Sequence, residues 1–179
     1  MNRTSDLNGK VAIITGSSSG VGAATAKQLA SMGCNVVINY ASSEDPAKLV
    51  AEDCKNFGVD VLICKADVSD DQACQKMVDE VLSHWGRIDI LINNAGTTKF
   101  VQHSDLAGLD KEDFQNIYGV NVIGPFQMIR AAEKALRESG NGAIVNVASI
   151  AGVRGVGSAC SAAADTASSA AMSKPWMVL

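Results

Sequence analysis

The chain has 179 residues, of which 47% are hydrophobic and 19% are charged, with a formal net charge of -4 at pH 7. This length predicts one globular domain with a sizeable core and leaves no room for a second full domain. The lysines and arginines are scattered, so we expect no nucleic-acid partner. No apolar run approaches the ~20 residues of a membrane span, and residues 1–10 contain no hydrophobic stretch typical of a secretory signal. We therefore expect a cytoplasmic protein without a membrane partner.

The five cysteines are odd in number and form no C-x-x-C or Cys/His cluster. They are Cys34, Cys54, Cys64, Cys74 and Cys160. We expect reduced thiols and no metal site, because zinc needs four converging ligands. Both histidines, His84 and His103, are expected to be solvated at the surface.

The first half of the chain alternates apolar runs with helical patterns. Residues 10–16 predict a strand, and the helical pattern that follows ends at Gly33. Its predicted apolar face consists of Val21, Ala24, Leu29 and Met32. Residues 35–40 predict a second strand. The next amphipathic helix has Pro46 in its first turn and ends at Gly58.

Residues 59–68 predict a third strand, and the helix after it begins with a capping-box pattern formed by Ser69 and Gln72. Residues 87–96 predict a fourth strand.

A longer helical pattern runs over residues 110–139, with Asp110 as its N-cap and a kink expected at Pro125. Residues 140–150 predict a fifth strand. Strands that alternate with helices and lack a period of two indicate an α/β fold, with a doubly wound parallel sheet covered on both faces.

The turn between the first strand and the first helix reads "TGSSSGVG", Thr15 to Gly22. Gly16, Gly20 and Gly22 follow the spacing G-x-x-x-G-x-G. Glycine is needed where a backbone takes positive φ or lies close to a pyrophosphate at a helix N-terminus. A tight structural turn is the alternative, but the position between strand and helix favours dinucleotide binding.

Four further motifs follow in order: "ADV" at 66–68, "NNAG" at 93–96, "NVIG" from Asn121 and "NVASIAG" at 146–152. With the glycine loop, they resemble the motifs of the short-chain dehydrogenase/reductase family. The resemblance covers roughly residues 8–155 and is closest to 3-oxoacyl-[acyl-carrier-protein] reductases and small sugar or alcohol dehydrogenases. It implies a Rossmann-like sheet with strand order 3-2-1-4-5.

The resemblance also implies cofactor-binding positions. Asp67 would bind the adenine amino group with Val68 beside the ring, and residues 94–96 would let the ribose lie close to the backbone. Taken alone, Asp67 could merely cap the turn before Ser69, and Asn94 could satisfy loop carbonyls. The implied set is Gly16, Ser18, Ser19, Gly20, Val21, Gly22, Tyr40, Ser42, Asp67, Val68, Asn94, Ala95 and Gly96.

Two catalytic positions are implied in the same way. Ser149 would hold the substrate carbonyl through its hydroxyl, and Asn121 would bind a water that feeds a proton relay. The alternative for Ser149 is an ordinary hydroxyl at a strand end.

The choice between NAD and NADP depends on the end of the second strand, which reads "NYASS" over residues 39–43. Tyr40 stands where an NAD site has an acidic residue, and Ser42 and Ser43 could hydrogen-bond a 2′-phosphate. The sequence therefore favours NADP over NAD.

The family's Tyr-x-x-x-Lys pair, which supplies the proton, begins about a dozen residues after the serine. Here that count reaches Ser161 and Ala162. Lys174 stands in a similar context, "AAMSK", but Ala170 occupies the tyrosine position there. The resemblance thus implies an NAD(P)(H)-dependent oxidoreductase for a small carbonyl or alcohol substrate, with little or no turnover because the acid is missing.

Residues 156–179 are rich in alanine and serine, and we expect an atypical tail rather than a separate domain after a 1–155 dinucleotide-binding domain. The loss of family character near Gly157 suggests a truncated fold that stops after the fifth strand. A frameshifted, alternatively spliced or mispredicted reading frame is one explanation, and a lineage of binding-only proteins is the other. The alternative function is accordingly a catalytically silent nucleotide-binding or interaction module, which would pair with itself or with intact relatives through the 110–139 helix.

Overall fold

The computed structural model describes residues 7–102 and 104–149. Its five strands form one parallel sheet in the order β3-β2-β1-β4-β5, which confirms the predicted fold class and strand order. The strands are β1 (Val11–Ile14), β2 (Asn35–Tyr40), β3 (Val61–Lys65), β4 (Ile90–Asn93) and β5 (Ala143–Asn146). The main helices are α1 (Gly20–Ser31), α2 (Glu44–Lys55), α3 (Asp71–Trp85), α4 (Lys111–Tyr118) and α5 (Gly124–Glu138).

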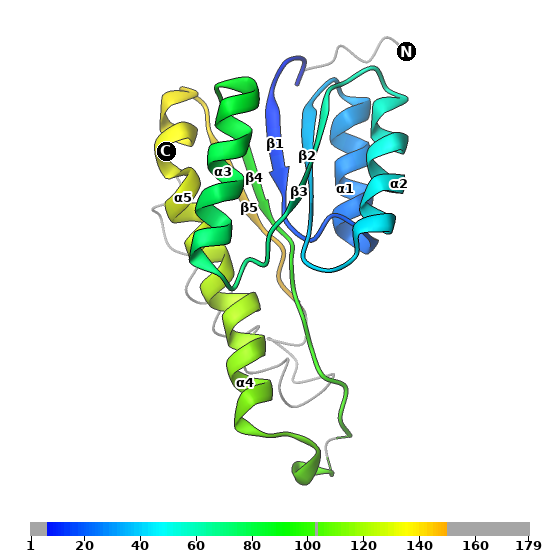
Figure 1. Ribbon diagram of the computed structural model, residues 1–179, viewed down its shortest axis with the longest axis vertical. Helices are drawn as coiled ribbons and strands as arrows, with labels where there is room; N and C mark the ends of the chain where they lie inside the picture. The colour runs from blue at the N-terminus through cyan, green and yellow to red at the C-terminus, as the bar shows by residue number, and fades with distance from the viewer. Residues whose placement is uncertain (1–6, 103, 150–179) are drawn as a thin grey trace.

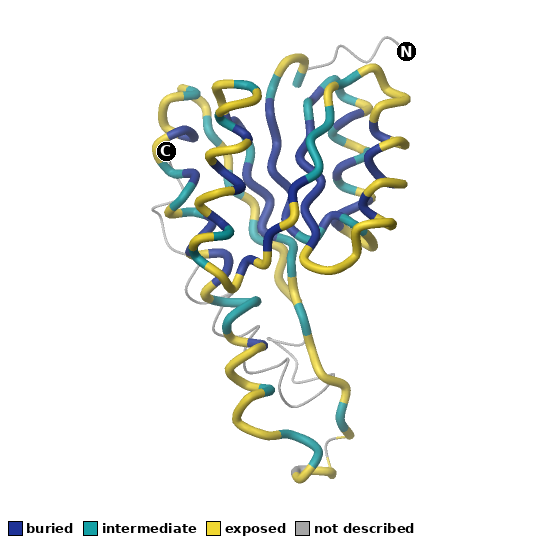
Figure 2. Tube along the Cα trace, viewed as in Figure 1, coloured by how far each residue is buried: buried dark blue, intermediate teal, exposed yellow. Residues whose placement is uncertain are grey.

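Helices cover both faces of the sheet, with α1 and α2 on one side and α3 and α5 on the other (Figure 1). Because side chains alternate along a strand, Ala12 and Ile14 of β1 pack toward α1 and α2, whereas Val11 and Ile13 pack toward the other layer. All four are buried, and Figure 2 shows the same burial along the central strands. This two-sided burial explains why the strands read as continuous apolar runs.

The buried face of α1 differs from the prediction. Val21 is 63% exposed and Ala24 is also exposed, so the expected stripe of large apolar residues is wrong. The buried residues of this helix are Gly22, Ala23, Ala26 and Ala30. Their small side chains let the helix approach the sheet closely, so burial here follows residue size rather than hydrophobicity. The helix ends as predicted at Gly33, whose φ is +87°.

The cap of α3 also differs. Asp70 is the N-cap, and its carboxylate accepts hydrogen bonds from the backbone N–H groups of Gln72 (2.9 Å) and Ala73 (3.3 Å). The predicted capping box of Ser69 and Gln72 is therefore wrong. Ser69 instead bonds through its backbone N–H and its hydroxyl to the Asp67 carboxylate, at 2.9 and 2.7 Å.

The predicted 110–139 helix consists of α4, a π-helical turn (Gly119–Ile123) and α5. Asp110 caps it as predicted, in a capping box with Asp113. A π-helical turn replaces the expected kink, and Pro125 lies in the first turn of α5. Because proline lacks the N–H that would close an α-helical bond to Asn121, the hydrogen-bond register changes just before it.

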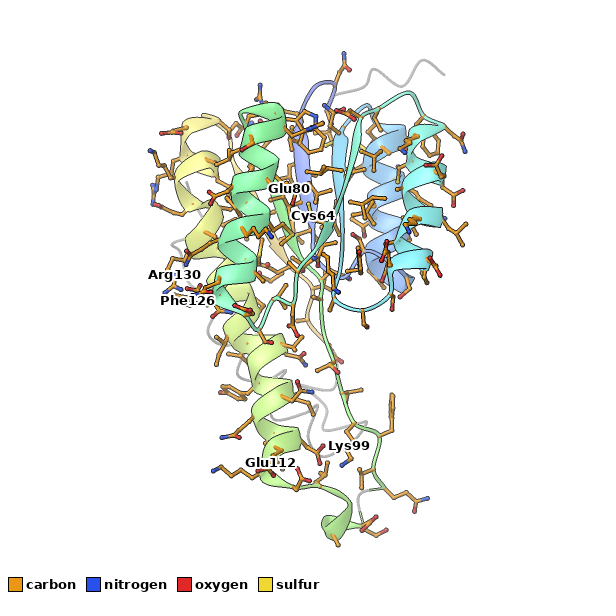
Figure 3. All side chains as sticks on the ribbon, in the orientation of Figure 1. Cys64, Glu80, Lys99, Glu112, Phe126 and Arg130 are labelled. Atoms are coloured by element: carbon orange, nitrogen blue, oxygen red, sulfur yellow. The ribbon has the colours of Figure 1, made fainter. Side chains whose placement is uncertain are left out.

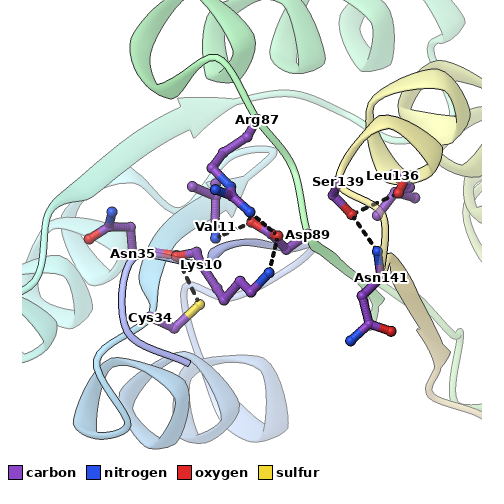
Figure 4. A network of polar contacts seen from close by, with 9 residues as sticks. All are labelled: Lys10, Val11, Cys34, Asn35, Arg87, Asp89, Leu136, Ser139 and Asn141. Atoms are coloured by element: carbon purple, nitrogen blue, oxygen red, sulfur yellow. Dashed lines mark hydrogen bonds and ion pairs between the residues drawn. The ribbon is translucent and has the colours of Figure 1, made fainter. Parts of the chain in front are cut away.

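A buried carboxylate joins β1 to β4 at the amino ends of these strands (Figure 4). Asp89 accepts hydrogen bonds from the backbone N–H of Val11 (3.0 Å), from Lys10 Nζ (2.9 Å) and from Arg87 Nε (2.8 Å). Burial of the Asp89 side chain favours a raised pKa, but the hydrogen bonds from Arg87, Lys10 and Val11 outweigh it and lower the pKa below its usual value.

The four described cysteines are free and buried. Burial raises the pKa of the Cys34, Cys64 and Cys74 thiols to about 12, so these groups stay protonated at neutral pH. His84 is exposed, and its Nε2 lies 2.8 Å from Asp60 Oδ2. Within residues 7–102 and 104–149 there is no His, Cys, Asp and Glu cluster suited to a metal, and no helix has the length and apolar character to cross a membrane. The predictions for His103 and Cys160 lie outside the described residues.

Candidate functional site

A cleft of about 510 Å³ lies at the carboxyl ends of the strands, where open parallel sheets bind ligands. Nine of the thirteen predicted cofactor positions line it: Gly16, Ser18, Ser19, Ser42, Asp67, Val68, Asn94, Ala95 and Gly96. The other lining residues are Asn39, Ala41, Ser43, Ala66, Thr97, Asn116 and Val120. Gly20, Val21, Gly22 and Tyr40 do not line the cleft.

The three loop glycines serve different purposes. Gly16 and Gly20 have φ of +62° and +56°, which strongly favours glycine. Gly22 has no such φ, but a Cβ there would lie 2.5 Å from Asn94 Nδ2 and 2.6 Å from the Gly16 carbonyl oxygen. A Cβ at Gly16 would lie 2.8 Å from Ala95 Cα. The loop is therefore packed directly against the end of β4, and this contact keeps side chains out of that corner of the cleft.

Thr15 and Asn94 hold these two segments together. The Thr15 hydroxyl oxygen accepts hydrogen bonds from the backbone N–H groups of Asn94 (2.9 Å) and Ala95 (3.0 Å). In return, Asn94 Nδ2 donates to the carbonyl oxygens of Thr15 (2.9 Å) and Gly16 (3.2 Å). The Asn94 side chain thus satisfies loop carbonyls, which is the structural role weighed for it, while its residue also lines the cleft.

Asn39 is a site residue that the sequence reasoning missed. It is 1% exposed, and its Oδ1 accepts a hydrogen bond from the backbone N–H of Gly16 at 2.9 Å. Its Nδ2 donates to the carbonyl oxygens of Cys64 (3.3 Å) and Ala66 (3.0 Å). The available signal was a polar residue within an otherwise apolar strand that is buried on both faces.

The end of β2 places Ser42 and Ser43 on the cleft but not Tyr40. Tyr40 is 8% exposed and packs in the core beneath α1 and α2. Burial, followed by the nearby Glu44 carboxylate, raises its pKa. Among the lining residues the only charged side chain is that of Asp67. Glu44, which begins α2, pairs with Lys48 at 2.7 Å.

Asp67 and Val68 form a wall of the cleft with contrasting exposure. Asp67 is exposed, and its Oδ1 accepts both hydrogen bonds from Ser69, so the turn-capping role weighed for it is present. Val68 is 4% exposed and belongs to the core under α3 and α5.

The two predicted catalytic residues do not line the cleft. Asn121 lies in the π-helical turn, where its Oδ1 accepts from the backbone N–H of Thr97 (2.8 Å) and its Nδ2 donates to the Thr97 carbonyl oxygen (3.0 Å). Ser149 is exposed beyond the end of β5. Asn121 thus contacts Thr97, which lines the cleft after β4, and Ser149 follows the neighbouring strand β5.

Ser161, Ala162, Ala170 and Lys174, which stand at or near the expected place of the tyrosine and lysine pair, lie outside the described residues. The chain has two tyrosines, Tyr40 and Tyr118, and Tyr118 is 44% exposed on α4.

Comparison with known proteins identifies the class to which this arrangement belongs. The family model for short chain dehydrogenase matches residues 10–174, so the match continues past residue 155, where the motif resemblance ends. The chain belongs to the short-chain dehydrogenase family. The predicted family membership is therefore confirmed.

One curated relative is the 3-oxoacyl-[acyl-carrier-protein] reductase FabG of Staphylococcus aureus, which is 36% identical over 146 residues, or 82% of this chain and 58% of the relative. A solved short chain dehydrogenase from Burkholderia cenocepacia J2315 in complex with NADP is 35% identical with a TM-score of 0.81, covering 90% of this chain and 64% of that one. An NAD+-bound xylitol dehydrogenase is 31% identical with a TM-score of 0.82, covering 93% and 62%.

The chain spans about half the length, between 49% and 58%, of eight curated relatives that it matches, the reductase of Staphylococcus aureus among them. The described cleft is lined mainly by small and polar residues from the glycine loop and from the segments after β2, β3 and β4.

Proposed function

We propose that the cleft binds a nicotinamide dinucleotide, with its pyrophosphate at the start of α1. The observation that carries this proposal is the glycine loop, held without side chains against β4 at the N-terminus of a helix. The first turn of α1 contains no acidic residue, and its N-cap Ser19 makes no side-chain capping bond. Its N–H groups and helix dipole therefore favour an anion.

Within this proposal, NADP is preferred over NAD. Ala41, Ser42 and Ser43 line the cleft at the end of β2, and no carboxylate from that strand faces it. Two hydroxyl groups there can donate to a 2′-phosphate, whereas an acidic residue would repel it. Adenine would lie between Asp67 and Val68 on one side and the glycine loop on the other.

When bound, the cofactor supplies hydride transfer to or from a carbonyl or alcohol carbon of a small substrate. The Ser149 hydroxyl would hold the substrate oxygen, and Asn121 would support a water-mediated proton path. Ser161 and Ala162 stand where the family's tyrosine is expected, and a serine hydroxyl is a poor acid at neutral pH. We therefore propose that turnover is slower than in relatives with the full pair, by about 10²–10⁴.

A second candidate function follows from this missing acid: a nucleotide-binding or interaction module without catalysis. Its candidate pairing surface is the outer side of α4 and α5, where Phe114 (46%), Tyr118 (44%) and Phe126 (47%) are exposed. Figure 3 shows Phe126 beside Arg130 on α5.

We also propose that residues 1–155 are the dinucleotide-binding domain and that residues 156–179 are not a separate domain.

The test is a fluorescence titration of the purified chain with NADPH and NADH, with oxidation of NADPH by a panel of small ketones followed in the same samples. Tighter binding of NADPH than NADH with little oxidation supports the proposal. Oxidation at the rate of relatives that carry the Tyr-x-x-x-Lys pair would overturn the missing-acid argument, and binding of neither cofactor would overturn the proposed function itself.

A further inference from the structure

The cleft wall formed by Ala66, Asp67 and Val68 directly follows β3, which is an edge strand of the sheet among the residues that the structure describes. Two of its carbonyl oxygens accept hydrogen bonds from buried side-chain amides of different layers of the fold, in addition to a backbone bond from the Ala66 N–H to the Tyr40 carbonyl oxygen (2.9 Å) and a bond from Cys74 Sγ to the Val68 carbonyl oxygen (3.3 Å). One is Asn39 at the end of β2, and the other is Gln127 in α5.

Asn39 holds the amino-terminal end of this wall. Its Nδ2 donates to the Ala66 carbonyl oxygen at 3.0 Å, while its Oδ1 accepts from the Gly16 N–H at 2.9 Å. The backbone N–H of Gly16 can only donate and the Ala66 carbonyl can only accept, so the orientation of the amide is fixed by its partners. One side chain therefore sets the spacing between the glycine loop and the wall.

Gln127 holds the other end. It is 8% exposed, and its Nε2 donates to the Val68 carbonyl oxygen at 2.7 Å. The backbone of α5 lies close to the same residue, because a Cβ at Gly124 would be 2.7 Å from Val68 Cγ2. Asp67, the exposed residue between the two held carbonyls, thus has its position determined from both sides.

We propose that Asn39 and Gln127 are positioning residues for the adenosine end of the cofactor. This inference rests on the proposed function. By fixing the Ala66 and Val68 carbonyls, the two amides hold the Asp67 carboxylate at one distance from the glycine loop before the ligand arrives. Loss of either amide would leave a wall that must be ordered on binding, and that ordering cost would lower the affinity.

The experiment compares Asn39→Ala and Gln127→Met with matched controls. Asn35→Ala changes the same residue type at the other end of β2, where Asn35 Oδ1 accepts from the Asp60 backbone N–H. Leu136→Ala opens a cavity in the same helix as Gln127, since Leu136 is fully buried. Dissociation constants for NADPH and for ADP, which lacks the nicotinamide half, are measured together with the melting temperature of each variant.

We expect Asn39→Ala and Gln127→Met each to raise the dissociation constants for NADPH and for ADP by the same factor. That factor is about tenfold, the equivalent of one hydrogen bond. The affinity of the double variant should fall by less than the product of the two single factors, because both amides hold one segment. The controls should lower the melting temperature but stay within about twofold of the wild-type affinity.

If Asn39→Ala or Gln127→Met does not stay folded, Asn39→Ser and Gln127→Leu replace each amide without burying a charge. Affinities within twofold of wild type, or an equal loss in the controls, would overturn the inference. A wild-type chain that binds neither NADPH nor ADP would instead show that the proposed function has failed.

Discussion

The substitution Gly22→Ala tests whether the glycine loop must lie against β4. The added methyl group would be 2.5 Å from Asn94 Nδ2, 2.6 Å from the Gly16 carbonyl oxygen and 2.9 Å from Ser17 Cα. Two of these atoms belong to the backbone, so rotation of a side chain cannot relieve the contact. The first turn of α1 must therefore move away from the backbone of Gly16 and Ser17, and the Asn94 side chain must also shift.

The magnitude follows from two costs. Overpacking of this kind costs about 1–3 kcal/mol, and loss of the hydrogen bond from Asn94 to the Gly16 carbonyl adds about 1 kcal/mol. We therefore expect the free energy of unfolding to fall by about 2–4 kcal/mol, which lowers the melting temperature by about 4–16 °C for a chain of this length. NADPH affinity should fall by at least about tenfold, because the displaced amides face the proposed pyrophosphate.

The assay is urea denaturation combined with NADPH titration, and Gly140→Ala is the matched control. Gly140 has φ of +75° and open space around its Cβ position, and it lies at the end of α5, away from the cleft. The Gly140→Ala variant should lose about 1 kcal/mol of stability and keep the wild-type affinity for NADPH. A Gly22→Ala variant as stable and as tightly binding as wild type would refute the packing argument.

Three further changes have expected outcomes. Asp89→Asn should lower the free energy of unfolding by about 1–3 kcal/mol, because the buried carboxylate loses its charge-assisted bonds. Since the folded-state pKa of Asp89 is lowered, this stabilisation is present above about pH 4 and is lost as the pH falls through the folded-state pKa. The urea midpoint of the variant, measured across pH 2–7, should therefore fall less steeply at acid pH than that of the wild type. A variant with the wild-type acid limb would contradict this. Asn121→Ala removes both bonds to Thr97 and should raise the hydrogen-exchange rate of the Thr97 amide by about tenfold, a loss of roughly 1.4 kcal/mol; unchanged exchange would show that other contacts hold the loop. Ser42→Arg should raise the ratio of NADPH to NADH affinity by about tenfold through a pair with the 2′-phosphate, and an unchanged ratio would mean that Ser42 lies away from that phosphate.

The sheet was predictable because its signals are local and repeated. The strands are short apolar runs rich in β-branched residues, most helices are amphipathic or begin at a capping residue, and parallel strands must be covered on both faces. The order of motifs along the chain then places their residues at one edge of the sheet. Nine of the thirteen predicted cofactor positions meet in one cleft for this reason.

The capping prediction was wrong because neighbouring side chains compete for the same partner. Ser69 looked like an N-cap, but the Asp67 carboxylate engages it and Asp70 caps α3 instead. The position of Tyr40 in the motif predicted a cofactor contact, and the structure places its ring in the core, outside the residues that line the cleft. Such outcomes depend on the tertiary packing of side chains, which a linear pattern does not contain.

Asn39 and Gln127 were missed for a related reason. A polar residue in an apolar strand signals a buried hydrogen bond, but its partners in β3 and the glycine loop are 23 to 27 residues away in sequence. Only the strand order brings them together.

The central claim is that the cleft at the strand ends binds a nicotinamide dinucleotide. The most direct measurement is an NMR titration of the ¹⁵N-labelled chain with NADPH, following the backbone amides. The account predicts saturable shifts confined to the glycine loop and the cleft wall, with Gly16, Asp67 and Gly96 among the largest and Gly140 unchanged. Shifts that miss these residues, or none at all, would contradict it.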